Sequence, residues 1–230
     1  RSPATVLSYL ATLAHVFSVA VKEWGWLEDT PMRKVTKPVL PRGRVRFLSD
    51  EERARLLAAC RGSANCKLYA IVVLALSTGA RRMEILGLKW SDIDFRREVL
   101  VLHETKNGER RLLPLVGHAL ELMQELANKR VTPTANDCEL VFPGKNLTKL
   151  LDMRAAWESA LKRAAIGDFR FHDLRHCCAS YLAMNGASLV EIAEVLGHKS
   201  LQMVKRYAHL SQAHTSQVVT SMNAKVFGGC

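Results

Sequence analysis

A basic, proline-containing segment divides the chain and limits what it can fold into. The stretch TKPVLPRGRVRF, which begins at Thr36, holds two prolines, a glycine and four basic residues but no acidic residue. This composition favours a linker, which we assign to residues 36–46. Residues 1–35 are too few for a stable core of their own, so they are expected to form part of a larger helical domain.

Helical periodicity dominates the chain, with one interruption. Apolar residues recur at helical spacing over residues 3–24, the apolar run LYAIVVLAL predicts a buried helix, and Ser49 with Glu52 forms a capping box. After these helices come two runs in which apolar and polar residues alternate. Asn107-Gly108 separates the two runs and is a strong hairpin signal. The sequence therefore predicts a mainly α fold with a small antiparallel β-sheet, an α+β class.

The charge balance points to a polyanionic partner. The formal net charge is +11 and the pI is about 9.6, which favours nucleic acid over an anionic membrane surface. We expect no membrane segment and no signal peptide, and therefore a cytoplasmic protein. The six cysteines form no C-x-x-C pair and are expected to be reduced. The first residue is Arg1, and we expect the chain to be a piece of a longer protein.

The segment HDLRHCCASYLAMNGASLVEIAEVLGHKSLQMVKRYAHL, which begins at His172, allows three interpretations. His172 and His176 are four residues apart and could ligate zinc, but no glutamate lies between them and arginines crowd the site. Glycines and a Ser188 capping box also suit two short helices of a helix-turn-helix unit. The third interpretation is catalysis, and it uses residues outside the segment.

Five separated motifs support the catalytic interpretation: T-G-x-R-x-x-E at residues 78–84, Lys106 at the hairpin, H-x-x-R at 172–175, L-G-H at 196–198, and R-Y at 206–207. Their order and spacing resemble the tyrosine recombinases, the phage integrase family. The resemblance implies a tyrosine-recombinase catalytic fold at 47–210. It also implies that residues 1–35, with the stretch AVKEWGW, are a partial helical core-binding domain, and that residues 211–230 are a tail with a protomer-linking helix.

The chemistry of a DNA phosphodiester suits these residue types. Arg81 and Arg175 can each bind the non-bridging oxygens with two N–H groups, which lysine cannot do. Tyr207 is the expected nucleophile, and it needs a proton acceptor because a free tyrosine has a pKa of about 10. His172 fits as a proton acceptor or an orienting donor, His198 as a donor to the phosphate, and Lys106 as general acid for the leaving oxygen. The resemblance implies that Glu84 supports the site structurally.

The resemblance implies a site-specific DNA recombinase or integrase of a phage, transposon or conjugative element. Tyr207 would form a covalent 3′-phosphotyrosyl link to double-stranded DNA and free a 5′-hydroxyl, with no metal and no cofactor. A homo-tetramer on DNA and accessory DNA-bending proteins are the expected partners, with no membrane. Two alternatives remain: a type IB topoisomerase, which uses similar chemistry, and a catalytically silent DNA-binding module.

Overall fold

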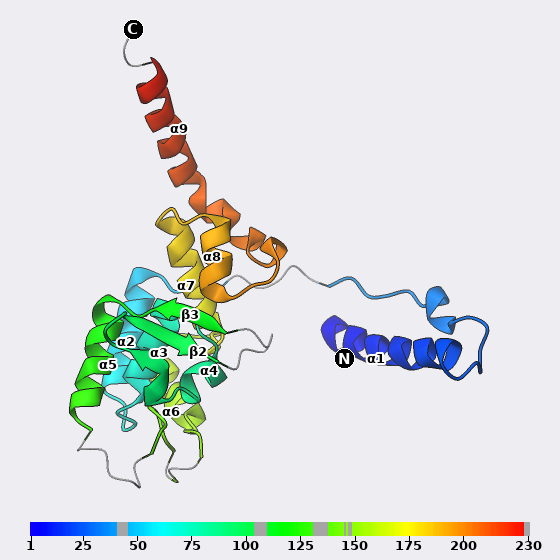
Figure 1. Ribbon diagram of the computed structural model, residues 1–230, viewed down its shortest axis with the longest axis horizontal. Helices are drawn as coiled ribbons and strands as arrows, with labels where there is room; N and C mark the ends of the chain where they lie inside the picture. Colours follow the sequence, from blue (N-terminus) through cyan, green and yellow to red (C-terminus); the bar gives the residue numbers. More distant parts are fainter. Residues whose placement is uncertain (41–45, 104–109, 131–137, 145, 147–148, 228–230) are drawn as a thin grey trace. The chain divides into compact units, whose positions relative to one another are not determined.

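The computed structural model divides into two compact units, Arg1–Arg44 and Val45–Cys230. It describes residues 1–40, 46–103, 110–130, 138–144, 146 and 149–227, except for the side chains of 211–215 and 217. Figure 1 traces the chain through both units. The sequence-based assignment of residues 1–35, 36–46, 47–210 and 211–230 to separate functional domains stays a prediction.

The smaller unit contains helix α1 (Pro3–Lys22) and the 3-10 turn η1 (Pro31–Lys34). The Ser2 hydroxyl caps α1 by accepting from the Thr5 amide at 3.2 Å, as the sequence predicts. By length and composition alone α1 could cross a membrane, with a mean hydropathy of 1.7, although core helices of other proteins pass the same test. The expectation of no membrane segment rested on the lack of a long enough apolar run. That premise is wrong for α1, because isolated Ser and Thr residues interrupt the apolar run without lowering its average hydropathy much.

The larger unit is a helical body built around α3 (Leu68–Thr78). Eight of the eleven α3 residues are buried, as expected for a helix that is apolar on all sides. It packs against α2 (Asp50–Arg61), α5 (Gly117–Asn128) and α7 (Asp173–Met184), while α6 (Arg154–Arg163) packs against α2. Figure 1 shows these helices gathered around α3. The core thus forms where the apolar run LYAIVVLAL predicts it.

A small sheet follows the short helix α4 (Arg82–Leu86) and the 3-10 turn η2 (Trp90–Asp92). Its strands, in the order β1 (Ile93–Asp94), β2 (Val99–Leu102) and β3 (Arg111–Pro114), pair antiparallel, and Leu102 faces Arg111 across the last pair. Burial alternates along β2 with the strand period of two. The antiparallel β2–β3 pair confirms the small sheet within a mainly α fold, while the expected Asn107-Gly108 turn lies outside the described residues.

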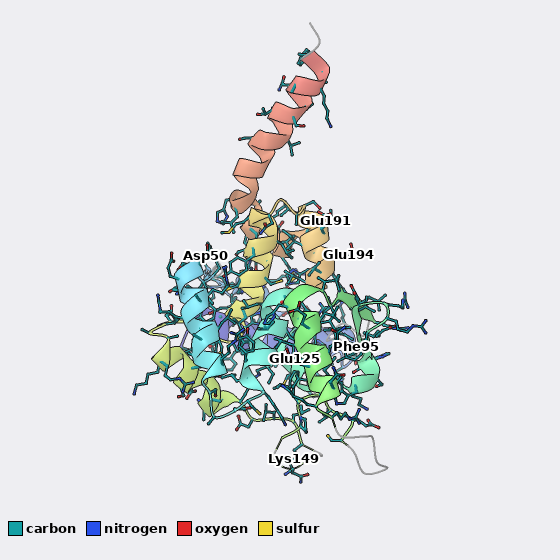
Figure 2. The ribbon with its side chains drawn as sticks, turned by 90° about the vertical axis from the view of Figure 1, so that its left-hand side faces the viewer. Asp50, Phe95, Glu125, Lys149, Glu191 and Glu194 are labelled. Carbon is teal, nitrogen blue, oxygen red and sulfur yellow. The ribbon has the colours of Figure 1, made fainter. Side chains whose placement is uncertain are left out.

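Helix α8 (Leu189–Leu196) follows α7 and begins at the predicted Ser188 capping box. Its exposed side carries Glu191 and Glu194 (Figure 2), whereas Ile192 and Leu196 are buried. This division of polar and apolar residues places one face of α8 in a second small core, which it shares with α7 and with the chain after α8.

The chain after α8 forms 3-10 segments, η3 (Leu201–Met203) and η4 (Lys205–Ser211), and then α9 (Gln212–Phe227). The predicted second helix of a helix-turn-helix pair is therefore absent from this described segment. Val204 and Tyr207 are three residues apart and are 0% and 1% exposed. The Tyr207 amide donates to the Val204 carbonyl, three residues back, at 2.9 Å, and both side chains pack against α7 and α8.

The central place of α3 can be tested by truncating Leu74, which is 1% exposed. Leu74→Ala should lower the free energy of unfolding of the larger unit by about 2–5 kcal/mol, because a cavity replaces a packed side chain. Val190→Ala, at a residue of α8 that is 60% exposed, should change it by less than about 0.5 kcal/mol. Urea unfolding followed by circular dichroism measures both, and equal effects would contradict the assignment of α3 as the core helix.

Candidate active site

The segment between α3 and α4 fixes the position of Arg81. The Thr78 hydroxyl donates to the carbonyl one turn back at 2.6 Å and accepts from the amide two residues ahead at 3.2 Å. Gly79 adopts a φ of +61°, and a Cβ on it would lie 2.5 Å from a Leu196 methyl group. Glycine is therefore required at this corner, which brings the start of α4 against the end of α8.

Glu84 ties Arg81 to Arg111, the first residue of β3. One carboxylate oxygen accepts from the Arg81 guanidinium at 2.7 Å, and the other accepts from the Arg81 backbone amide at 2.7 Å and from the Arg111 guanidinium at 2.9 Å. Burial opposes the charge of Glu84, but these donors outweigh burial and lower the pKa of the carboxyl group. Glu84 is thus a buried anion that holds two cations.

Arg175, near the start of α7, is 4% exposed. Its guanidinium donates to the Gly79 carbonyl at 2.6 Å and also to the Leu196 carbonyl, which accepts a second hydrogen bond from Arg111. Burial, followed by the charges of Arg81 and Arg111, lowers the pKa of Arg175 to about 10. Arg175 therefore stays charged at neutral pH, and it belongs to one electrostatic cluster with Arg81.

His198 lies directly after the left-handed Gly197 that ends α8. Its backbone amide donates to the Ala193 carbonyl at 2.9 Å. Its Nδ1 is buried, and no atom of the described part of the chain hydrogen bonds to it. Burial, followed by the charges of Arg175 and Arg81, lowers the pKa of His198 to about 4. The ring is therefore neutral at pH 7 and carries one N–H donor.

Tyr207, in η4, is 1% exposed, and its hydroxyl is hydrogen bonded to Nδ1 of His176 on α7. Burial, followed by the charge of His172, lowers the pKa of His176 to about 4, so that the neutral ring can accept a hydrogen bond from the Tyr207 hydroxyl. Burial raises the pKa of Tyr207 to about 12, although Arg206 and Arg175 favour the phenolate. In this structure Tyr207 is a neutral, hydrogen-bonded phenol.

His172 is the N-cap residue of α7, and the centroid of its ring lies 5.4 Å from that of His176 in an edge-to-face arrangement. Burial, followed by the charge of Arg175, lowers the pKa of His172. Within the described ranges, no group of three or more His, Cys, Asp or Glu side chains is arranged to hold a metal ion. His176 contacts the tyrosine, and not a third ligand as the zinc interpretation requires.

Contacts and charge interactions join six of the seven predicted site residues: Arg81, Glu84, His172, Arg175, His198 and Tyr207. Lys106 lies outside the described residues, and the role of each residue stays a prediction. Sequence reasoning missed Arg111, and it considered His176 only as a metal ligand. The position of His176 directly after H-x-x-R, one helical turn from His172, was the available indication. The available indication for Arg111 was that a charged residue lies opposite the apolar Leu102 in the hairpin.

A cleft of about 1110 Å³ lies beside Arg81 and His172. Its lining includes the basic residues Arg82, Lys89 and Arg170, and the aromatic ring of Phe171. Two carboxylates, Glu84 and Asp92, are also among the lining residues. Basic side chains outnumber acidic ones, so the cleft favours an anionic ligand.

Comparison with known proteins places this site in a family. Residues 46–214 match the model of the phage integrase family. A shufflon-specific DNA recombinase of Escherichia coli is 37% identical over 222 residues, which cover 96% of this chain and 54% of that protein. The solved catalytic domain of bacteriophage HP1 integrase is 28% identical with a TM-score of 0.60, over 80% of this chain and 98% of that chain.

A solved transposon Tn1549 integrase in complex with transposon right-end DNA has a TM-score of 0.78 at 17% identity, over 95% of this chain and 80% of that chain, and this likeness concerns the fold. The chain spans about half the length of the curated relatives it matches, 54% of one and 58% of another. The larger unit has the tyrosine-recombinase catalytic fold. Since the family model covers most of the residues, the chain belongs to the phage integrase family of tyrosine recombinases.

Proposed function

We propose that this chain carries the strand-cleavage and strand-transfer centre of a site-specific DNA recombinase. The observation that supports the proposal most is the network that holds Arg81, Arg175 and His198 beside a buried tyrosine. A silent DNA-binding module has no need for this combination. The names of the relatives, a recombinase and integrases, favour strand exchange over the relaxation of supercoils by a type IB topoisomerase.

The two arginines have donors to spare for a phosphate. A guanidinium group has five N–H donors. Arg175 uses two of its N–H groups on backbone carbonyls, and Arg81 uses one on Glu84. The remaining N–H groups can bind the non-bridging oxygens of a DNA phosphate, and their charge stabilises the additional negative charge of the transition state. The N–H of neutral His198 adds a further donor.

In the proposed reaction the Tyr207 oxygen attacks the phosphorus, so that a P–O bond to tyrosine forms and the P–O5′ bond breaks. Lys106 gives a proton to the departing 5′-oxygen, and His172 takes the phenol proton. Since Tyr207 is 1% exposed and bonded to His176, its hydroxyl must leave His176 before it reaches a phosphate. The 5′-hydroxyl of a partner strand then reverses the step. The bond energy is kept in the covalent link, so no external energy source is needed.

The proposed partner is double-stranded DNA, on which four protomers assemble with accessory DNA-bending proteins. The charge of +11, the basic cleft and the DNA complex of the transposon integrase support DNA as the partner. The named relatives come from bacteria and phages, which supports action on DNA in the bacterial cytoplasm. We further propose that α9 links protomers, because its described apolar side chains are exposed: Val218, Val219, Met222, Val226 and Phe227.

Tyr207→Phe tests the proposed function directly. The variant keeps the ring but lacks the nucleophile, so it should bind DNA as the parent does and form no covalent complex on nicked suicide duplexes that carry candidate recombination sites. The parent should form this complex in excess EDTA, because two arginines supply the positive charge. Denaturing gels measure the complex and mobility shifts measure binding.

Tyr69→Phe is the matched control, since Tyr69 lies on α3 and its hydroxyl is bonded to Arg61 and His118. This variant should react as the parent does. Covalent trapping in the Tyr207→Phe variant would exclude Tyr207 as the nucleophile. A parent that cleaves only with a divalent ion would revive the metal interpretation of His172 and His176.

Lys106→Ala tests the general acid. Cleavage of ordinary DNA should slow by about 10²–10⁴-fold, the usual contribution of a positioned proton donor. Cleavage of DNA with a 5′-bridging phosphorothiolate should slow much less, because a thiolate leaves without protonation. Single-turnover rates on both substrates give the comparison, with Lys129→Ala, at the exposed end of α5, as the control. An equal defect on both substrates would remove Lys106 from this role.

Deletion of the residues after Leu210 tests the tail. Recombination and assembly should be impaired more than cleavage, because the lost apolar side chains of α9 belong to a contact between protomers. Val218→Ser with Met222→Ser should reproduce the defect in the full chain, whereas Lys225→Ala should not. Sedimentation on DNA and covalent trapping measure assembly and cleavage separately. Equal loss of both would count against a protomer-linking helix.

A further inference from the structure

We infer that Arg111 is a positioning residue for strand cleavage: it joins the Glu84 carboxylate to the Leu196 carbonyl and thereby sets where Arg81 and His198 meet the scissile phosphate. This inference rests on the proposed function. Arg111 begins β3, and its contacts reach α4 and the end of α8. It therefore connects the sheet to the start of α4, which follows Arg81, and to the end of α8, which precedes His198.

The contacts of Arg111 close a ring around the site. Arg81 donates to Glu84, Glu84 accepts from Arg111, and Arg111 donates to the Leu196 carbonyl. Arg175 donates to the same carbonyl and also to the carbonyl of Gly79, two residues before Arg81. Removing Arg111 deletes its hydrogen bonds to Glu84 and to the Leu196 carbonyl. Arg81 and Arg175 are then no longer connected through Glu84 and Arg111.

Burial separates the role of Arg111 from that of a phosphate ligand. The Arg111 side chain is 10% exposed, whereas that of Arg81 is 25% exposed. The two Nη atoms of Arg111 are engaged by Glu84 and Leu196, and its Nε is buried without a hydrogen-bond partner in the described part of the chain. Arg111 therefore acts through the residues that it holds.

The glycine before His198 fits tightly beneath the Arg111 side chain. Gly197 has a φ of +63°, and a Cβ on it would collide with the Arg111 guanidinium and lie 2.9 Å from Arg111 Cδ. The turn that carries His198 is thus packed directly against Arg111. A shift of this side chain releases the turn, and displacements of about 1 Å in a catalytic site can cost about 10²-fold in rate.

Arg111 also offsets part of the negative charge of Glu84, the carboxylate that pairs with Arg81. Glu84 is 6% exposed and interacts with both guanidinium groups. Without Arg111, the carboxylate has only Arg81 as a cationic partner among these contacts. It then holds Arg81 more strongly and repels an incoming phosphate. A defect of this kind is electrostatic, so neutralising Glu84 should relieve part of it.

Arg111→Met tests the inference in the full chain. The rate of covalent complex formation at saturating nicked DNA should fall on the order of 10²-fold, with little change in DNA affinity. Arg111→Lys keeps the charge but cannot span both acceptors, so its rate should fall less, on the order of tenfold. Adding Glu84→Gln to Arg111→Met should raise the rate roughly tenfold above that of the single variant. A purely structural role of Arg111 predicts no such recovery.

Arg110→Met is the matched control, because Arg110 is the exposed neighbour and loses the same charge. It should form the covalent complex at the parental rate at saturating DNA. Arg111→Met at the parental rate, Arg110→Met as slow as Arg111→Met, or no recovery in the double variant would each overturn the inference. If urea unfolding shows that Arg111→Met is unfolded, the rate of Arg111→Lys decides, and a parental rate overturns the inference. A parent that forms no complex would instead contradict the proposed function.

Discussion

Two guanidinium groups share the backbone carbonyl of Leu196, and the rest of the site depends on that shared acceptor. Carbonyls at the C-terminal end of a helix lack partners within the helix and favour cations. Arg175 reaches this carbonyl from α7 and Arg111 reaches it from β3, so three elements meet at one oxygen. The positive charges of Arg111 and Arg175 can lie this close because Glu84 balances that of Arg111. Loss of one member of the Arg111–Glu84 pair would leave a buried charge uncompensated.

The electrostatic state of the site without a bound anion follows from this crowding. Arg175 has its pKa lowered to about 10 and His198 to about 4, in both cases by burial first and by neighbouring arginines second. A bound phosphate adds negative charge at this place, so it relieves the repulsion and favours the protonated forms. The free protein therefore holds these donors in an arrangement that an anion stabilises.

Local patterns were enough to predict much of the fold, and distant contacts account for what was missed. The Ser49 and Ser188 capping boxes and the apolar α3 depend on neighbours in sequence, and the structure confirms all three. The bond between His176 and Tyr207 spans 31 residues, and that between Arg111 and Leu196 spans 85. Periodicity does not show which strand residue meets which helix end. The family motifs marked the residues expected to touch the phosphate and also Glu84, but they left out Arg111 and His176, which contact Glu84 and Tyr207.

Under the proposed function, the burial of Tyr207 has a consequence for the safety of a chromosome. A basic DNA-binding protein meets on the order of 10⁶–10⁹ unrelated sites for each correct one. A permanently exposed reactive phenol would make every such encounter an opportunity to break a strand. Here the Tyr207 hydroxyl is hydrogen bonded to His176, and the Tyr207 ring packs with Val204 in the second small core. With Tyr207 as the proposed nucleophile, accidental breakage would be limited by how rarely that core opens, and the packing of two side chains would protect the host genome.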